Sequence, residues 1–268
     1  MSTLIVRLRP LWWMAGLCLL GILQACATPA RPPQDVQTES DQTDADRRAR
    51  VRMELAAAYF GRGQSNTALD ETKLALQAKP DLAEAFNLRG LIYGSMNEPV
   101  LAEDSFRRAL QLNPRDADAM HNFGWFLCQQ RRHAEANGQF EAALVVPNYR
   151  DMVRTLLAQG ICQARNNQWA EAEKTLLRSY ELDSANPTTA MNLAEVLYRR
   201  GEYERARFYV RRVNAIDDLI SAQTLWMAAR IEHRLGQPVQ VQTLGNQLRN
   251  RFPQSPEALR FEKGQFDD

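Results

Sequence analysis

The chain of 268 residues carries 33 basic and 32 acidic side chains, so its formal net charge is only +1. A nearly neutral chain lacks the bulk attraction that nucleic-acid phosphates or anionic surfaces would exert, and we therefore expect no nucleic-acid partner.

The first 25 residues have the features of an export signal. Arg7 and Arg9 supply a positive segment, and an apolar core over residues 11–25 is interrupted only by Gln24. This core is too short for the ~20 residues that a membrane-spanning helix needs, so we predict a signal peptide over residues 1–25.

A cysteine follows directly after the apolar core. The segment LQAC at residues 23–26 resembles the lipobox of bacterial lipoproteins, in which the cysteine is acylated and becomes the first residue of the mature chain. The alternative is an ordinary signal peptide with a chance cysteine. Several acyl chains on Cys26 would anchor the protein stably, because each buried CH₂ contributes roughly 0.8 kcal/mol. Ala27 and Thr28 resemble the sorting signal for the outer membrane, so we expect a lipid anchor on its periplasmic face.

Residues 26–48 are predicted to form a flexible tether. Between residues 27 and 50, Val36 is the only large apolar side chain, and it lies among prolines, glutamines, threonines and aspartates. Such a segment cannot bury enough surface to offset the entropy lost on ordering. The folded domain is therefore expected over residues 49–268.

The folded domain consists of repeats with a period of about 34 residues. Apolar residues recur at helical spacing with almost no strand pattern, and Pro80 and Pro114 lie 34 residues apart. This period is typical of tetratricopeptide repeats, and it predicts an all-α, right-handed superhelical solenoid of six helix-turn-helix repeats. A non-repeating helical bundle is the alternative. The repeats are predicted to start near Ala49, Ala83, Ala117, Val153, Pro187 and Ala222.

Small residues recur where the two helices of a repeat are expected to cross closely. In the first helices they are Ala56, Gly90, Gly124, Gly160, Ala194 and Ala229. In the second helices the pairs are Ala68/Ala75, Ala102/Ala109, Ala136/Ala143, Ala172/Ser179 and Ala206/Val213, whereas the sixth pair, Val241/Leu248, departs from the pattern.

The turn inside each repeat is expected to need a positive φ, which favours glycine. The residues at this position are Gly63, Asn97, Arg131, Asn167, Gly201 and Gly236.

The first helices are expected to line a concave groove, because the core does not need their inner side chains. The predicted groove residues are Phe60, Asn87, Leu91, His121, Trp125, Met191, Tyr198, Trp226 and Arg230, with Met53, Ala57, Leu157 and Ile161 at equivalent positions. Large apolar and aromatic groups on an exposed surface favour an apolar or extended peptide partner. The alternative is that several of them pack neighbouring repeats. The groove lacks the lysines and asparagines with which chaperone-type repeats clamp a terminal carboxylate, which disfavours that ligand class.

Two cysteines, Cys128 and Cys162, remain after the signal and the lipid site are set aside, and both lie in first helices of adjacent repeats. In an oxidising compartment such a pair predicts a disulfide, with buried free thiols as the alternative. His121 lies seven residues before Cys128, but His121, Cys128 and Cys162 are only three ligands without a fourth, which argues against a metal site.

The sequence contains no Gly-x-Ser-x-Gly, His-Glu-x-x-His or phosphate-binding glycine loop. We therefore expect no enzyme activity, cofactor, metal or small-molecule substrate.

Four segments resemble type IV pilus biogenesis lipoproteins of the PilF/PilW family. They are NEPVLAEDSFRRAL (97–110), HNFGWFLCQQRRHAEA (121–136), GICQARNNQWAEAE (160–173) and LRNRFPQSPEALRF (248–261). The resemblance covers the signal, lipobox, tether and six repeats, and the cysteine pair matches the branch in which two repeats are cross-linked. It implies a pilotin, a monomeric lipid-anchored protein that binds the outer-membrane secretin and promotes its localisation and multimerisation. A repeat lipoprotein that serves a cell-wall synthase or outer-membrane protein assembly is the alternative.

Overall fold

The computed structural model describes residues 43–266. The predicted signal peptide, Cys26 and most of the predicted tether lie outside the described residues. All regular elements within residues 43–266 are helices, which confirms the all-α fold class. None of the helices in this range combines the length and the apolar character that crossing a bilayer requires.

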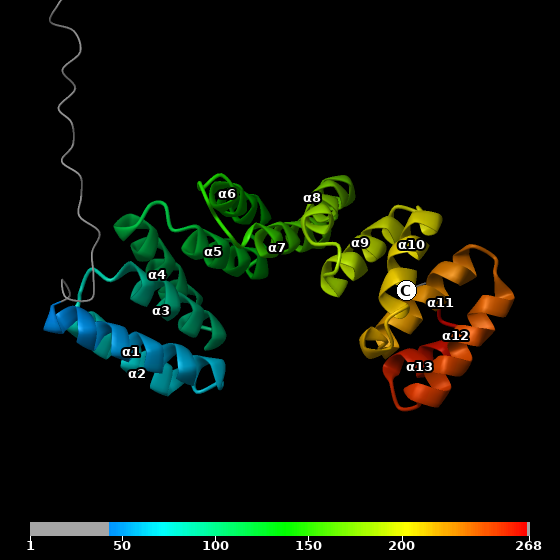
Figure 1. Ribbon diagram of the computed structural model, residues 1–268, viewed down its shortest axis with the longest axis horizontal. Helices are drawn as coiled ribbons and strands as arrows, with labels where there is room; N and C mark the ends of the chain where they lie inside the picture. The colour runs from blue at the N-terminus through cyan, green and yellow to red at the C-terminus, as the bar shows by residue number, and fades with distance from the viewer. Residues whose placement is uncertain (1–42, 267–268) are drawn as a thin grey trace, which may run out of the picture. The chain divides into compact units, whose positions relative to one another are not determined.

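Within the described residues, consecutive helices form six pairs, each of which packs on the next along the chain (Figure 1). The first helices of the pairs are α1 (Asp44–Gly61), α3 (Ala83–Ser95), α5 (Ala117–Gln129), α7 (Met152–Arg165), α9 (Pro187–Arg199) and α11 (Ala222–Arg234). The second helices are α2 (Ser65–Ala78), α4 (Pro99–Leu112), α6 (His133–Leu144), α8 (Trp169–Leu182), α10 (Tyr203–Asn214) and α12 (Pro238–Arg251). A short 3₁₀ helix, η2 (Asp217–Leu219), lies between α10 and α11.

The boundaries of the pairs agree with the predicted repeat frame except at the first repeat. The other five first helices begin at the predicted residue or, for α7, one residue before it. Helix α1 instead begins at Asp44, so residues 44–48, predicted to belong to the tether, are helical. The extra turn is stabilised because Asp44 and Asp46 place negative charge at the helix N-terminus and Lys79 Nζ contacts Asp46 at 2.7 Å. Ala45 and Asp46 of this turn are half-buried, and Ala49, which follows it, is 1% exposed.

The predicted small positions are the points of closest approach between paired helices. All six residues of the first-helix set are buried. A Cβ atom at Gly160 would lie 2.5 Å from Leu176 Cγ, and one at Gly124 would lie 2.9 Å from a ring carbon of Phe140. The pairs predicted in the second helices are buried as well, including the divergent Val241 and Leu248. At Gly124 and Gly160 one large side chain of the second helix therefore packs directly on the backbone of the first helix, and an added methyl group would displace it.

The turn inside every repeat has the left-handed conformation that the sequence predicts. The φ angles at Gly63, Asn97, Arg131, Asn167, Gly201 and Gly236 are +73°, +60°, +61°, +58°, +77° and +66°. The left-handed conformation costs a residue with a side chain roughly 1–2 kcal/mol, a cost that the glycine turns avoid.

A disulfide joins Cys128 of α5 to Cys162 of α7, with a Cα–Cα distance of 5.8 Å. Both cysteines are buried, and both belong to a cluster that contains Phe106, Phe123 and Phe140. The cross-link therefore connects the third and fourth repeats through their first helices, inside an apolar and aromatic core.

A further helix, α13 (Pro256–Glu262), follows the six pairs and was not predicted as a separate element. It begins 34 residues after α11, and Ser255 caps it as Ser221 caps α11. It packs on α11 and α12, and Phe261 lies against Gly245, where a Cβ would come within 1.9 Å of the ring. Helix α13 is thus the start of a seventh first helix that covers the apolar end of the sixth repeat.

We predict that Gly160→Ala lowers the free energy of unfolding by about 1–3 kcal/mol, because the new methyl group overlaps Leu176. The matched control is Gly138→Ala in α6, where the added Cβ has no atom within 4 Å beyond its chain neighbours and the backbone of its own helix. This control should leave stability unchanged or raise it by up to about 1 kcal/mol through helix propensity. Urea unfolding of both variants measures the difference, and equal stability of the two would contradict the close-crossing interpretation.

We also predict that reduction of the Cys128–Cys162 disulfide lowers the free energy of unfolding by up to roughly 3.8 kcal/mol, because the unfolded chain loses the constraint of a closed loop of about 34 residues. The measurement is the urea midpoint with and without a thiol reductant. A Cys128→Ser/Cys162→Ser variant serves as the control, since its midpoint should not respond to the reductant. A wild-type midpoint that stays constant while thiol titration shows full reduction would refute the prediction.

Candidate functional site

The predicted groove residues fall into two groups according to their burial. Phe60, Asn87, Leu91, Trp125 and Met191 are half-buried, and we refer to these five residues as the first-helix strip. His121, Tyr198, Trp226 and Arg230 are buried. The first-helix strip therefore keeps part of each side chain accessible, whereas the second group does not form an open surface.

Contacts between neighbouring first helices hold the first-helix strip in place. Asn122 Nδ2 of α5 donates a hydrogen bond to Asn87 Oδ1 of α3 at 3.1 Å. The guanidinium group of Arg165 in α7 lies 4.9 Å from the ring centroid of Trp125. Leu91 and Trp125 pack against the cluster that contains the disulfide. These residues thus contribute to packing between repeats and still present apolar and amide groups, which suits non-covalent binding of an extended segment.

His121 is a buried contact between repeats, so its assignment to an open groove is wrong. Its Nδ1 lies 2.9 Å from Thr155 Oγ1, which also lies 2.8 Å from Tyr149 Oη. Burial lowers the pKa of His121 to about 4, with a smaller contribution from the positive charge of Arg154 and an opposing one from Asp151. The imidazole is therefore neutral at pH 7 and serves the junction between the third and fourth repeats.

Tyr198 and Trp226 were predicted to be exposed, and this prediction is wrong. Each is only 6% exposed. The guanidinium group of Arg230 lies 4.4 Å from the ring centroid of Tyr198, and the ring of Phe266 stacks on Trp226 at 5.2 Å. The segment that follows α13 therefore covers the part of the predicted groove formed by the last repeats.

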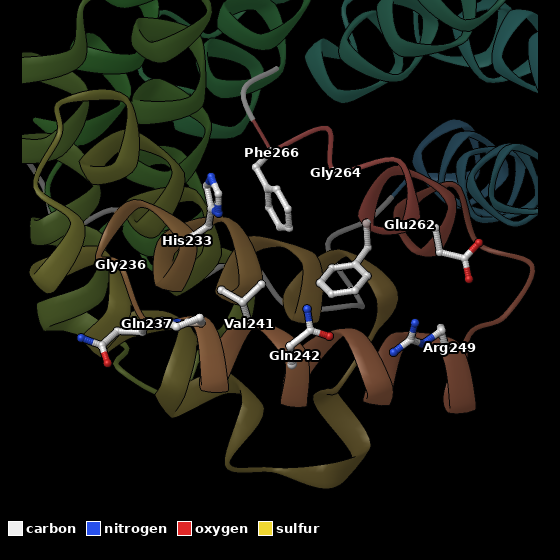
Figure 2. A pocket seen from close by; sticks show the side chains of 11 residues that line it. His233, Gly236, Gln237, Val241, Gln242, Arg249, Glu262, Gly264 and Phe266 are labelled. Atoms are coloured by element: carbon white, nitrogen blue, oxygen red, sulfur yellow. The ribbon is translucent and has the colours of Figure 1, made fainter.

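A cavity of about 660 Å³ lies beside Phe266 (Figure 2). Its lining includes His233, Val241, Gln242, Arg249 and Phe261, which come from α11, α12 and α13. His233 and Phe266 were not predicted as site residues. His233 lies seven residues after Trp226, so the repeat frame could have placed it on the same helix face, but no periodic signal identifies Phe266.

Cys128, His133 and Cys162 place one possible ligand atom each within 4.8 Å of one another. His133, rather than the His121 considered from spacing, approaches the cysteines, with Nδ1 3.5 Å from Cys162 Sγ. The two sulfur atoms are joined in the disulfide and are not the thiolates that metal coordination needs. This cluster is accordingly a structural cross-link.

Six helix pairs with small crossing residues, left-handed turns and a truncated terminal helix define a tetratricopeptide-repeat protein. Family models of the tetratricopeptide repeat match residues 83–116, 105–144 and 157–218.

The sequence is 27% identical over 210 residues to the type IV pilus assembly protein PilF of Pseudomonas aeruginosa, and the match covers 78% of this chain and 83% of that protein. A crystal structure of PilW, described as a widely conserved type IV pilus biogenesis factor, superimposes with a TM-score of 0.73 at 29% identity over 79% of this chain and 96% of PilW. A structure of P. aeruginosa PilF gives a TM-score of 0.71 at 25% identity over 83% of this chain and 100% of that chain. This chain is therefore a tetratricopeptide-repeat protein homologous to PilF and PilW.

We predict that stability falls by up to about 3 kcal/mol as the pH drops from 6.5 to 4, because the pKa of His121 is about 4 in the folded protein, against an ordinary value of 6.5. In this window the unfolded chain binds a proton that the folded chain excludes. Urea unfolding at pH 7, 5.5 and 4.5 measures the loss. His121→Gln should reduce the pH dependence of stability in this window, and an unchanged slope in that variant would contradict the assignment.

Proposed function

We propose that this protein is a lipid-anchored type IV pilus biogenesis factor, a pilotin that binds the outer-membrane secretin and promotes its localisation and multimerisation. The observation that carries the proposal is the similarity to PilW at 29% identity over 79% of this chain, together with that to PilF over 78%. Both relatives are named as factors in type IV pilus assembly or biogenesis.

The described residues support a binding role rather than a chemical one. The first-helix strip combines an amide at Asn87, which bonds across two helices, with the apolar side chains of Leu91, Trp125 and Met191. Such a surface can hold an extended protein segment through side-chain contacts. In a secretin monomer, an extended segment held in this way would be shielded from non-specific pairing of its strand edges until the ring assembles.

The proposed location rests on two further features. Cys26 would carry the acyl chains that hold the domain at the periplasmic face of the outer membrane, and several chains on one residue give a stable anchor. The Cys128–Cys162 disulfide supports an oxidising compartment such as the periplasm. Anchoring would raise the local concentration of the repeat domain at the membrane where the secretin assembles.

The test is an immunoblot of unboiled outer membranes for the high-molecular-weight secretin in cells that lack this gene. We expect the multimer to vanish on deletion and to return with the wild-type gene. Cys26→Ala should fail to restore it at the outer membrane, because the domain loses its anchor. Trp125→Ala should weaken secretin binding more than about tenfold, because large aromatic residues dominate interface energetics.

The matched control for Trp125 is Phe208→Ala, which removes an aromatic side chain that is 53% exposed on the second helix α10. This variant should restore the multimer fully. Equal activity of the two variants would reject the first-helix strip as the binding surface. Multimers that are unchanged in every strain would reject the secretin proposal and leave an adaptor for a cell-wall synthase or for outer-membrane protein assembly.

A further inference from the structure

Phe266 inserts its ring among three aromatic side chains at the end of the sixth repeat. Its ring centroid lies 4.3 Å from that of His233 at an interplanar angle of 11°, and 5.2 Å from that of Trp226 at 27°. Phe261 meets it edge-on at 5.7 Å and 83°. Figure 2 shows the Phe266 ring beside His233. Two stacked contacts and one edge-on contact are the geometries that aromatic pairs prefer, so the site is shaped for a flat ring.

The site also recognises the main chain of the segment that it holds. Tyr198 Oη donates a hydrogen bond to the carbonyl oxygen of Phe266 at 3.5 Å and accepts one from Arg234 Nε at 3.3 Å. Tyr198 and His233 occupy the same position in α9 and α11, eleven residues after the helix start. The contacts to Phe266 thus include side chains on the predicted groove face of successive first helices. The two groups recognised here are an aromatic ring and a main-chain carbonyl, and any extended segment with an aromatic residue offers both.

Phe266 packs against the cluster that closes the end of the sixth repeat, but it does not belong to helix α13. Helix α13 ends at Glu262, and its residues Ala258 and Phe261 are buried against the sixth repeat. Phe266 follows four residues later in a segment without regular structure and remains half-buried. The cap formed by α13 is therefore built from residues that precede this segment.

The main chain between α13 and Phe266 is held locally. Gly264 N donates to Phe261 O and Gln265 N donates to Arg260 O, both at 3.0 Å, and these bonds close the C-terminal end of α13. Gly264 has a φ of +65°, a conformation in which glycine can change direction at little cost. The backbone dihedral angles that follow the Gln265 N–H lie outside these two bonds, so a rotation there would move Phe266 and leave the C-terminal bonds of α13 intact.

The open space beside the Phe266 ring is larger than the segment that follows α13 fills. The cavity of about 660 Å³ extends from Phe266 along α12, where Gln237, Gln242 and Arg249 offer polar groups. Residues that flank an aromatic side chain in a longer segment would find both volume and hydrogen-bond donors there.

We propose that this site binds an extended segment of a partner protein through one aromatic side chain, and that the chain's own Phe266 occupies the site until such a segment displaces it. Phe266 acts as a built-in competitor, because its attachment to the same chain gives it a high effective concentration. The inference concerns a surface separate from the first-helix strip and does not depend on which pilus component is bound.

The test uses a fluorescein-labelled peptide with the sequence of residues 262–268, EKGQFDD, titrated with the full chain in detergent and followed by fluorescence anisotropy. Phe266→Ala should bind the peptide at least tenfold more tightly than wild type, because its own ring no longer competes. A peptide with alanine in place of the phenylalanine should lose at least tenfold in affinity for this variant. Trp226→Ala introduced into Phe266→Ala should abolish the gain.

The matched control is Leu259→Ala, which shortens an apolar side chain that is 52% exposed on α13 and should behave like wild type. Circular dichroism and thermal melting establish that each variant is folded, and His233→Ala in the Phe266→Ala background provides a second lesion if Trp226→Ala unfolds. The proposal is overturned if Phe266→Ala binds no better than wild type, or if the peptide without phenylalanine binds equally well.

Sedimentation of the wild type over a range of concentrations distinguishes a second copy of this chain from a different partner. A monomer at all concentrations is the expected result. A dimer that Phe266→Ala abolishes would show that the occupant is the same segment of a neighbouring copy, and it would overturn the proposal of a partner protein.

Discussion

The close crossing of two helices within each repeat is the constraint on which the rest of this structure depends. At Gly160 the absence of a Cβ lets Leu176 pack directly on the backbone of α7, and Gly124 admits the ring of Phe140 in the same way. The crossing fixes the distance between paired helices and thereby the face of each first helix that meets its neighbour. The disulfide between α5 and α7 and the hydrogen bond between His121 and Thr155 both depend on that fixed stacking.

A stack of repeats must also end, and its end determines where a partner can bind. The sixth repeat alone would leave apolar surface uncovered. Helix α13 takes the place of the next first helix and covers this surface with Phe261. The chain then continues past α13 and places Phe266 against Trp226 and His233. Phe261 therefore caps the sixth repeat and also forms one wall of the site, whereas Phe266 occupies that site.

The two sites considered for binding differ in their physical character. The first-helix strip is held by contacts such as Asn122 with Asn87 and Arg165 with Trp125, and its side chains already share their area with the core. The site at the end of the sixth repeat is instead aromatic, lies beside a cavity and contains a displaceable ring. The segment proposed to bind the first-helix strip would contact repeats between the first and the fifth, whereas the one proposed for the aromatic site would contact the last repeats.

The sequence by itself determined the repeat period, the crossing residues and the left-handed turns, because each of these is a local requirement that recurs every 34 residues or so. It also predicted that Cys128 and Cys162 lie on neighbouring helices, though it left a disulfide and free thiols as alternatives. Only the tertiary structure decided that α1 begins at Asp44, because Lys79 and Asp46 meet across 33 residues. It likewise decided the burial of Tyr198 and Trp226, since Phe266 reaches them from a segment without periodicity and its path depends on long-range contacts.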